Sequence, residues 1–243
     1  MQIIGRTDTG KIRSVNEDCF ATGELPGGAV FAIICDGMGG ANGGSVASNT
    51  AVKIITDQLA NSYRLGMNSV SVQRMLQTAA FAANITIYDM AKSIKTLEGM
   101  GTTLVIVLVI EDIAYIAHAG DSRVYLIQDK TPEQLTRDHS VVQHMMEMGE
   151  LTKEEAMNHP RRNVITRALG VNETVEVEYT EIELSTDDIV LLCTDGLTNY
   201  VSETDMLEVF THNKFEDLCD KLIENANENG GGDNITVVIL LKQ

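Results

Sequence analysis

The sequence lacks any apolar segment long enough to cross a membrane. Its longest uninterrupted apolar runs, such as residues 104–110, fall far short of the roughly 20 residues that a bilayer span requires. Residues 1–8 also lack the apolar region of a signal peptide. CxxC pairs are absent, and we expect the four cysteines to be buried free thiols in a reducing compartment. Together these absences predict a cytoplasmic protein with no membrane partner.

Basic residues are scarce in this chain. Lysine and arginine number 18 against 35 aspartates and glutamates, which gives a formal net charge of -17. A chain this acidic is not expected to bind nucleic acid, whose phosphates it would repel. With 243 residues, of which 44% are hydrophobic, it has enough material for a sizeable core, and no repeat or linker divides it. We therefore predict a single domain over residues 1–243.

Several familiar catalytic motifs are also missing. The sequence has no GxxxxGK[ST] phosphate loop, no GxSxG nucleophile elbow and no D-x-[DN]-x-[DN]-G calcium loop. No cysteine is followed six positions later by an arginine, which excludes a cysteine-nucleophile phosphatase at the level of motifs. The five histidines show no zinc-binding spacing.

Hydrophobic periodicity predicts long helices and antiparallel strands. A helical period runs through residues 43–62 and 69–94. Strands are predicted at residues 102–110, 113–119 and 123–128, and their connections are so short that they must form hairpins. Further strands are predicted at 2–10, 19–22, 29–35, 175–184, 189–194 and 235–241, and shorter helices at 141–148, 153–157, 202–210 and 214–229. This pattern indicates an α+β fold in which helices cover two packed antiparallel sheets.

Aspartates stand at the ends of the most apolar strands. The run of residues 29–35 ends on Asp36, which three glycines follow within four positions. Residues 189–194 lead to Asp195, and Asp233 precedes the last strand. In antiparallel neighbours, the end of one strand lies beside the beginning of the next. We therefore expect Asp36, Asp195 and Asp233 to gather at one edge of the sheets.

Three more acidic residues lie at strand ends and can join this cluster. They are Asp121 in a Gly-Asp-Ser hairpin, and Glu17 with Asp18 at the entry of a strand. Taken singly, each acidic residue is explained by an ordinary turn or polar loop. Their repetition at strand ends favours a common site, where adjacent carboxylates repel one another unless cations neutralise them. Ligation by oxygen alone selects hard ions, Mg²⁺ or Mn²⁺.

The motifs that hold these acidic residues resemble those of a known family. They are Arg13-x-x-Asn16-Glu17-Asp18, Asp36-Gly-Met-Gly-Gly40, Gly120-Asp-Ser-Arg123, Thr194-Asp-Gly-Leu197 and Gly232-Asp-Asn-Ile-Thr236. In order and spacing, from about residue 5 to residue 241, the chain resembles the metal-dependent serine/threonine protein phosphatases of type 2C, in particular the compact bacterial members. The resemblance implies a central β-sandwich flanked by helices on both sides. It also implies phosphoprotein substrates and a cognate serine/threonine kinase, and we expect a monomer.

The resemblance assigns a role to each acidic residue. It implies that Asp36 bridges two metal ions and that the Gly37 carbonyl ligates one of them, while Asp195 and Asp233 complete the shell of the second ion. Glu17 and Asp18 are implied to hold metal-bound waters, and Asp121, with Asp195, a third and weaker metal.

The resemblance also implies a mechanism. A hydroxide that bridges the two ions attacks phosphorus in line, with no covalent enzyme intermediate, and Arg13 contacts the substrate phosphate. The implied catalytic residues are Arg13, Asp36 and Asp195. The chain departs from the family at Met38, where many eukaryotic members have a histidine that is proposed to protonate the leaving oxygen. Methionine has no proton to donate, so we hypothesise that a metal-bound water or another side chain does so.

Residues 138–170 are implied to form a flap that faces the substrate. Arg161, Arg162 and Arg167 concentrate positive charge there, and we predict that Arg161 and Arg162 meet a phosphopeptide. Helix capping or surface ion pairs explain these arginines equally well.

Two other functions use the same fold. A non-catalytic module that binds phosphoproteins would be expected to lack one or more of the metal-binding aspartates, and all of them are present here. A metal-dependent hydrolase of small phosphate esters would share the site and differ only in its substrate groove. The complete set of aspartates favours an enzyme.

Overall fold

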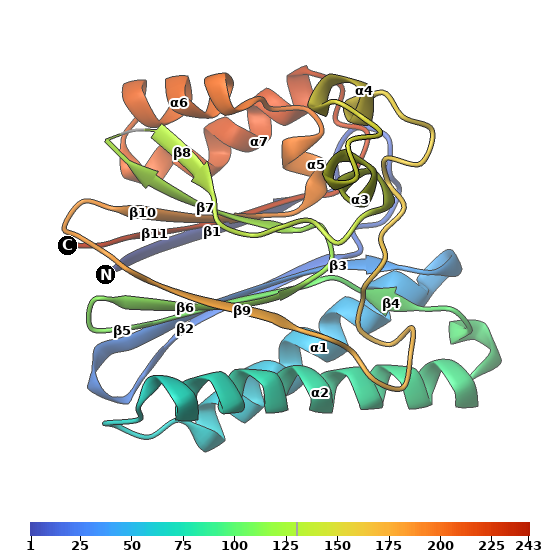
Figure 1. The fold of residues 1–243 in the computed structure, drawn as a ribbon, viewed down its shortest axis with the longest axis horizontal. Coiled ribbons are helices and arrows are strands. Elements are labelled where there is room, and N and C mark those ends of the chain that lie inside the picture. The colour runs from blue at the N-terminus through green and yellow to red at the C-terminus, as the bar shows by residue number, and fades with distance from the viewer. Residues whose placement is uncertain (130) are drawn as a thin grey trace.

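Two antiparallel sheets face each other at the centre of the molecule (Figure 1). The structure is a computed structural model that describes residues 1–129 and 131–243, apart from the side chains of residues 40–42. The strands are β1 (Gln2–Asp8), β2 (Asp18–Leu25), β3 (Ala29–Met38), β4 (Gly101–Thr102), β5 (Leu104–Ile110), β6 (Ile113–Ala119), β7 (Arg123–Gln128), β8 (Thr131–Gln134), β9 (Glu178–Glu183), β10 (Ile189–Cys193) and β11 (Ile235–Leu241). One sheet has the order β1–β11–β10–β7–β8, and the other β2–β3–β5–β6–β9, with β4 paired to β3.

Helices cover the outer face of each sheet, as Figure 1 shows. The α-helices are α1 (Gly40–Ser62), α2 (Ser69–Ser93), α3 (Val141–Glu147), α4 (Lys153–Met157), α5 (Asp195–Thr198), α6 (Glu203–His212) and α7 (Leu218–Glu228). Short 3-10 helices lie at η1 (Pro26–Gly28), η2 (Lys95–Leu97) and η3 (Phe215–Asp217). The long helices α1 and α2 lie against the sheet that contains β3, and α6 and α7 lie against the sheet that contains β11. The predicted four-layer arrangement is confirmed.

Strand β3 is apolar from Ala29 to Cys35 because both of its faces are buried there. Ile33 belongs to the core beneath α1 and α2, which includes Ile55 of α1. Ile34, on the opposite face, belongs to the core between the sheets together with Leu192 of β10. A strand buried on both faces needs an uninterrupted apolar run, whereas a half-exposed strand alternates. The strand thus carries its terminal aspartate out of the densest part of the core.

The predicted elements are present, with differences at their ends. The short strand β8, the single turn of α5 and the 3-10 helices η1 and η2 were not predicted, and the predicted strand at 102–110 is divided into β4 and β5. The predicted helix at 214–229 is divided into η3 and α7, and the predicted strand at 175–184 shortens to β9. The cysteines are free thiols, three buried and Cys19 half-buried. Within the part of the chain described, the helices are too short or too polar to span a bilayer.

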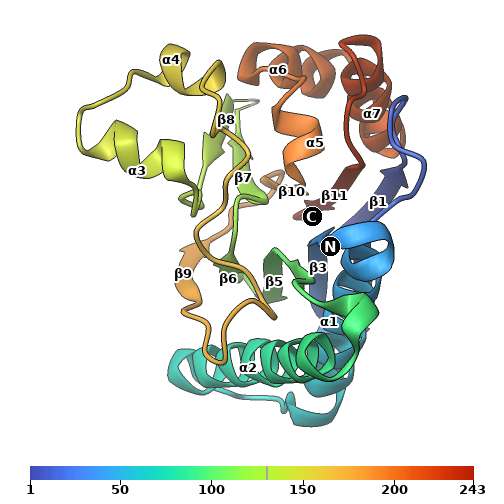
Figure 2. The same ribbon diagram turned by 90° about the vertical axis from the view of Figure 1, so that its right-hand side faces the viewer.

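The segment of residues 138–170, predicted as a flap, stands at one end of the sandwich. Figure 2 shows α3 and α4 set apart from the helices that cover the two sheets. Both begin with a side-chain cap, because Ser140 accepts a hydrogen bond from the Gln143 amide and Thr152 forms a capping box with Glu155. The segment returns to the sandwich through an isolated bridge between Leu169 and Thr102.

Candidate metal centre

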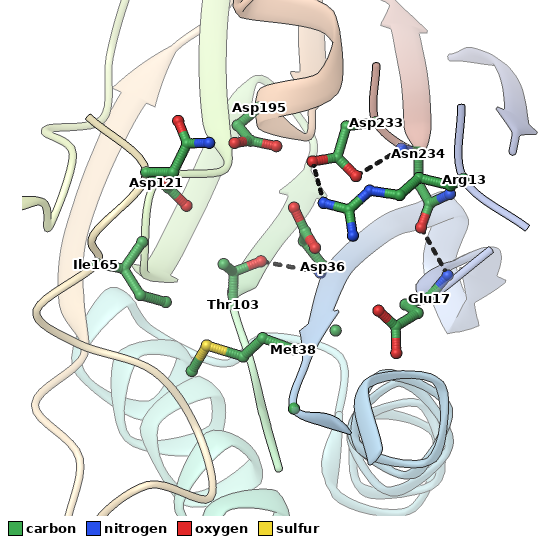
Figure 3. Close-up of a pocket in the computed structure, with 13 residues that line it drawn as sticks. Arg13, Glu17, Asp36, Met38, Thr103, Asp121, Ile165, Asp195, Asp233 and Asn234 are labelled. Carbon is green, nitrogen blue, oxygen red and sulfur yellow. Dashed lines mark hydrogen bonds and ion pairs between the residues drawn. The ribbon is translucent and has the colours of Figure 1, made fainter. Parts of the chain in front are cut away.

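A cavity of about 360 Å³ opens where the strand ends converge. Most of the acidic residues predicted for the site face it, and Figure 3 shows Asp36, Asp195 and Asp233 turned toward the same space. The cavity is lined by Arg13, Glu17, Asp36, Gly37, Met38, Gly39, Thr103, Asp121, Asn163, Ile165, Asp195, Asp233 and Asn234. The fold therefore brings together residues that lie up to 221 positions apart (Arg13 to Asn234).

The backbone of Asp36 is fixed by two threonines that follow η2. Its amide donates a hydrogen bond of 2.9 Å to the Thr103 hydroxyl, and its carbonyl accepts from the Thr103 amide and the Thr102 hydroxyl, both at 2.8 Å. The next residue must be glycine, because a Cβ on Gly37 would lie 2.1 Å from the carbonyl oxygen of Gly44. The strand end is thus locked before any ion binds.

Asp195 and Asp233 are fixed from the other sheet. Asp195 is the first residue of α5, and its Oδ2 accepts a 3.0 Å hydrogen bond from the Asn199 side chain. Asp233 accepts at Oδ1 from the Asn234 amide (2.9 Å) and at Oδ2 from Nη2 of Arg13 (2.8 Å), as Figure 3 shows. The Arg13 side chain is half exposed, so its remaining N–H groups can reach a ligand in the cavity.

Asp18 lies beneath the cavity and does not line it. It pairs with Asp36 in the register of β2 and β3 and is only 7% exposed. Its Oδ2 accepts hydrogen bonds from the hydroxyls of Thr194 (2.9 Å) and Thr236 (2.7 Å), whereas its Oδ1 is buried without a partner. A buried carboxylate oxygen with no donor is costly unless a cation or a water molecule meets it.

Burial and mutual repulsion raise the pKa of the carboxyl groups in and beneath the cavity, which favours their protonated form. Burial, followed by the neighbouring Asp18 and Asp195 charges, raises the pKa of Asp36 well above its usual value. Burial raises the pKa of Asp18 to about 7 and that of Asp121 to about 8, and it also raises the pKa of Asp195. Cations placed among these groups would restore their ionised form. The oxygen donors, their repulsion and the unpartnered Asp18 oxygen all fit hard divalent ions.

The side of the cavity opposite the aspartates is apolar. Met38 and Ile165 lie there, and no histidine is among the described residues that line the cavity. The structure thus places Met38 where the sequence predicted it and offers no imidazole in its place.

The flap contributes to the cavity differently from what was expected. Asn163 and Ile165 line it, whereas Arg161 lines a neighbouring hollow and its Nη2 lies 3.6 Å from the Met145 sulfur. Arg162 is exposed. Contact of Arg161 and Arg162 with a substrate therefore stays a prediction that would require the peptide to extend beyond the cavity.

Sequence reasoning missed the polar residues that hold the acidic ones. They are Thr102, Thr103, Thr194, Thr236 and Asn234. The Asn234 side chain accepts from the Glu17 amide and donates to two carbonyls of the preceding loop, so it fixes the segment that carries Arg13. Each threonine lies beside an apolar run, but nothing in that local pattern indicates which carboxylate or amide it meets.

The chain is similar to known phosphatases over nearly its whole length. The sequence model of the family described as protein phosphatase 2C matches residues 11–237. A serine/threonine phosphatase, stp, of Listeria monocytogenes is 42% identical over 97% of this chain and 93% of its own. The serine/threonine phosphatase of S. agalactiae has a structure with a TM-score of 0.94, at 33% identity, over 100% of this chain and 99% of its own.

A further structure is that of the catalytic domain of the phosphatase PstP in complex with two manganese ions. It has a TM-score of 0.86 and 34% identity, over 98% of this chain and 96% of its own. The similarity of sequence and of structure thus covers every strand end that carries an aspartate of the cavity. The chain belongs to the protein phosphatase 2C family.

Proposed function

We propose that the acidic cavity binds two Mn²⁺ or Mg²⁺ ions through Glu17, Asp18, Asp36, Gly37, Asp195 and Asp233, and a third, weaker ion through Asp121 and Asp195. The protein is a serine/threonine protein phosphatase of the metal-dependent 2C type. The observation that carries the proposed ligand set is the group of buried, mutually repelling carboxyl groups around one cavity, whose charges divalent cations would offset. When bound, such ions make water acidic enough to act as the nucleophile and offset charge on the phosphoryl oxygens.

Arg13 is proposed to bind the phosphoryl group of the substrate. Its guanidinium is oriented by the 2.8 Å ion pair with Asp233, which leaves other N–H groups of the planar fork to donate to phosphate oxygens. Asp36 and Asp195 are proposed as the catalytic carboxylates, because Thr102 and Thr103 fix the backbone of Asp36, Asp195 is the first residue of α5, and both side chains turn into the cavity (Figure 3). The proton for the leaving oxygen is proposed to come from water, since Met38 has none to give.

The substrate is proposed to be a phosphoserine or phosphothreonine side chain of a protein, and a cognate serine/threonine kinase is proposed to supply it. The exposed flap residues Arg161 and Arg162 are proposed to contact the phosphopeptide beyond the cavity. We further propose that the protein acts as a monomer in the cytoplasm and that residues 1–243 form one domain with a flap at 138–170. The net charge of -17 supports the absence of a nucleic-acid partner.

The proposal is tested by hydrolysis of a phosphothreonine peptide and of p-nitrophenyl phosphate, with added Mn²⁺ and with chelator. We expect turnover of both with Mn²⁺ and none with chelator. The Asp195→Ala variant should lose activity and still fold, because the change removes a metal ligand and a buried charge. Asp57→Ala, an exposed position on α1, is the matched control and should behave as wild type. Activity that survives chelation, or in Asp195→Ala, would contradict the ligand assignment.

A further inference from the structure

His139 makes two hydrogen bonds to a single residue of the cavity rim. It lies between β8 and α3, at the start of the flap, and is only 5% exposed. Its backbone amide donates to the Gly120 carbonyl (2.9 Å), and its ring Nδ1 accepts from the Gly120 amide (3.1 Å). Both polar backbone groups of Gly120 are therefore satisfied by His139. Gly120 immediately precedes Asp121, so these bonds fix the backbone from which the side chain of Asp121 extends.

The other side of the same hairpin is fixed through Thr103. Gly120 has a φ of +115° and packs so closely that an added Cβ would lie 2.7 Å from the Thr103 Cβ. The hydroxyls of Ser122 and Thr103 are 2.7 Å apart, and Thr103 also accepts from the Asp36 amide. Asp121 is thus held between two neighbours, of which Thr103 links it to Asp36 and His139 links it to the flap.

The ring of His139 has a defined tautomer. Because Nδ1 accepts from an amide, the proton lies on Nε2, which donates to Oε1 of Glu178 at 3.0 Å. The ring of His118 stacks on it, with centroids 4.8 Å apart, and burial lowers the pKa of both histidines. The neutral ring is therefore the form that the surrounding groups require.

This tautomer argues against a metal ion among His118, His139 and Glu178, whose ligand atoms lie within 4.8 Å of one another. An ion on Nε2 would leave His139 without a ring proton, whereas metal-bound histidines donate from their other nitrogen. The guanidinium of Arg167 also lies 3.2 Å from Nε2, where it would repel a cation. His118, His139 and Glu178 therefore act through hydrogen bonds and not as metal ligands.

The backbone carbonyl of His139 completes the link to the flap. It accepts a 2.7 Å hydrogen bond from the Thr166 amide, next to Ile165, which lines the cavity. We propose that His139 is a positioning residue that fixes Asp121 relative to the flap segment at residues 163–166 and thereby sets the affinity of the metal at Asp121. The inference rests on the proposed metal-binding role of Asp121, and it assigns His139 no contact with substrate.

The test compares two substitutions of His139 that are similar in shape and differ in their terminal polar atoms. In His139→Asn, Oδ1 can take the place of Nδ1 and accept from Gly120, whereas His139→Leu leaves that buried amide unpaired. The unpaired amide should let the hairpin at Gly120 and Asp121 shift toward another partner, and we expect the affinity for the weakest Mn²⁺ ion to fall about tenfold in His139→Leu. His139→Asn should stay within about threefold of wild type. His212→Leu, an exposed position at the end of α6, is the matched control and should not change binding.

Mn²⁺ binding is measured directly, from the electron paramagnetic resonance signal of the free ion, together with the Mn²⁺ concentration that gives half-maximal peptide hydrolysis. Equal Mn²⁺ affinity in His139→Leu and wild type would overturn the proposal, even if the variant unfolded at a lower temperature. Equal loss in the Leu and Asn variants would also overturn it, because the acceptor atom would then be irrelevant.

A measurement on the wild-type protein covers the case in which His139→Leu does not fold. A scalar coupling between the Gly120 amide nitrogen and His139 Nδ1 in ¹⁵N NMR reports the hydrogen bond, and a protonated Nδ1 would overturn the proposal. Absence of Mn²⁺-dependent turnover in wild type would refute the proposed function, whereas a normal wild type with an unaffected Leu variant refutes only the role of His139.

Discussion

When divalent cations are removed, the free energy of unfolding of this protein should fall as pH rises. Burial raises the pKa of Asp18 to about 7 and that of Asp121 to about 8, from an ordinary value of 3.8. Without cations the folded state therefore binds more protons than the unfolded state between these values. Stability is then fully present below the unfolded pKa and is lost as pH rises toward 7 and 8. Ordinary aspartates show the opposite trend, because their pKa falls on folding.

The size of the expected loss in the free energy of unfolding can be worked out for Asp18 alone. It is only 7% exposed and faces no solvent-filled space, so the difference between 3.8 and about 7 corresponds to a loss of about 4 kcal/mol in the free energy of unfolding. About 3 kcal/mol of this falls between pH 5 and pH 8. Asp121 lines the cavity, where water reduces its contribution. The loss is large beside the roughly 5–15 kcal/mol that stabilises a typical domain.

The assay is urea unfolding in chelator at pH 5, 6.5 and 8, repeated with Mn²⁺. Asp18→Asn is the matched variant, because its amide oxygen can still accept from Thr194 and Thr236 while the charge is gone. We expect Asp18→Asn to be more stable than wild type at pH 8 in chelator and to gain less from Mn²⁺. His118 and His139 have lowered pKa values, which makes stability rise with pH below about 6.5, and the comparison between variants cancels that effect. If the two proteins show the same pH slope in chelator, the electrostatic account of the cavity is wrong.

Two further changes probe the reaction itself. Arg13→Ala should raise the KM for a phosphothreonine peptide about tenfold or more, because charge-assisted hydrogen bonds to the phosphate are lost. The urea midpoint should stay near that of wild type, because the side chain is half exposed. An unchanged KM in steady-state assays would show that Arg13 does not bind the phosphate. Met38→His should raise turnover of the phosphothreonine peptide relative to p-nitrophenyl phosphate, because only the peptide's alkoxide, the poorer leaving group, needs a proton. An unchanged ratio of the two rates would mean that position 38 does not act on the leaving oxygen.

The sequence predicted the parts of the site that local pattern determines. A strand buried on both faces must be apolar throughout, so the point where the apolar run of β3 stops marks the edge of the core and locates Asp36. The same pattern marks Asp195 after β10, and antiparallel pairing of β10 with β11 brings Asp195 close to Asp233. Strand periodicity and antiparallel pairing are enough for these inferences, whereas Asp36 meets the other two because the two sheets pack face to face.

The supporting groups were not predictable because their partners are distant in sequence. The Asp18 carboxylate meets the hydroxyls of Thr194 and Thr236, 176 and 218 positions away, and nothing near Asp18 announces them. Strand β8 was missed for a different reason. It is a short edge strand, and residues 131–134 are polar, so they lack the alternation of apolar and polar residues by which a strand is predicted. Tertiary pairing, and not local preference, creates both features.

The way in which the cavity is built leaves most of its aspartates without a basic partner in the part of the chain that the structure describes. Among the described residues, the one ion pair that joins a basic side chain to a lining aspartate is Arg13 with Asp233. Asp36 and Asp195 are held instead by backbone contacts and by neutral hydroxyl and amide donors, which fix a position without cancelling a charge. Arginines in those places would have stabilised the protein without ions and would have occupied the sites that the ions need. We therefore expect the cation-free state to be less stable, and the proposed binding of divalent cations would relieve that cost.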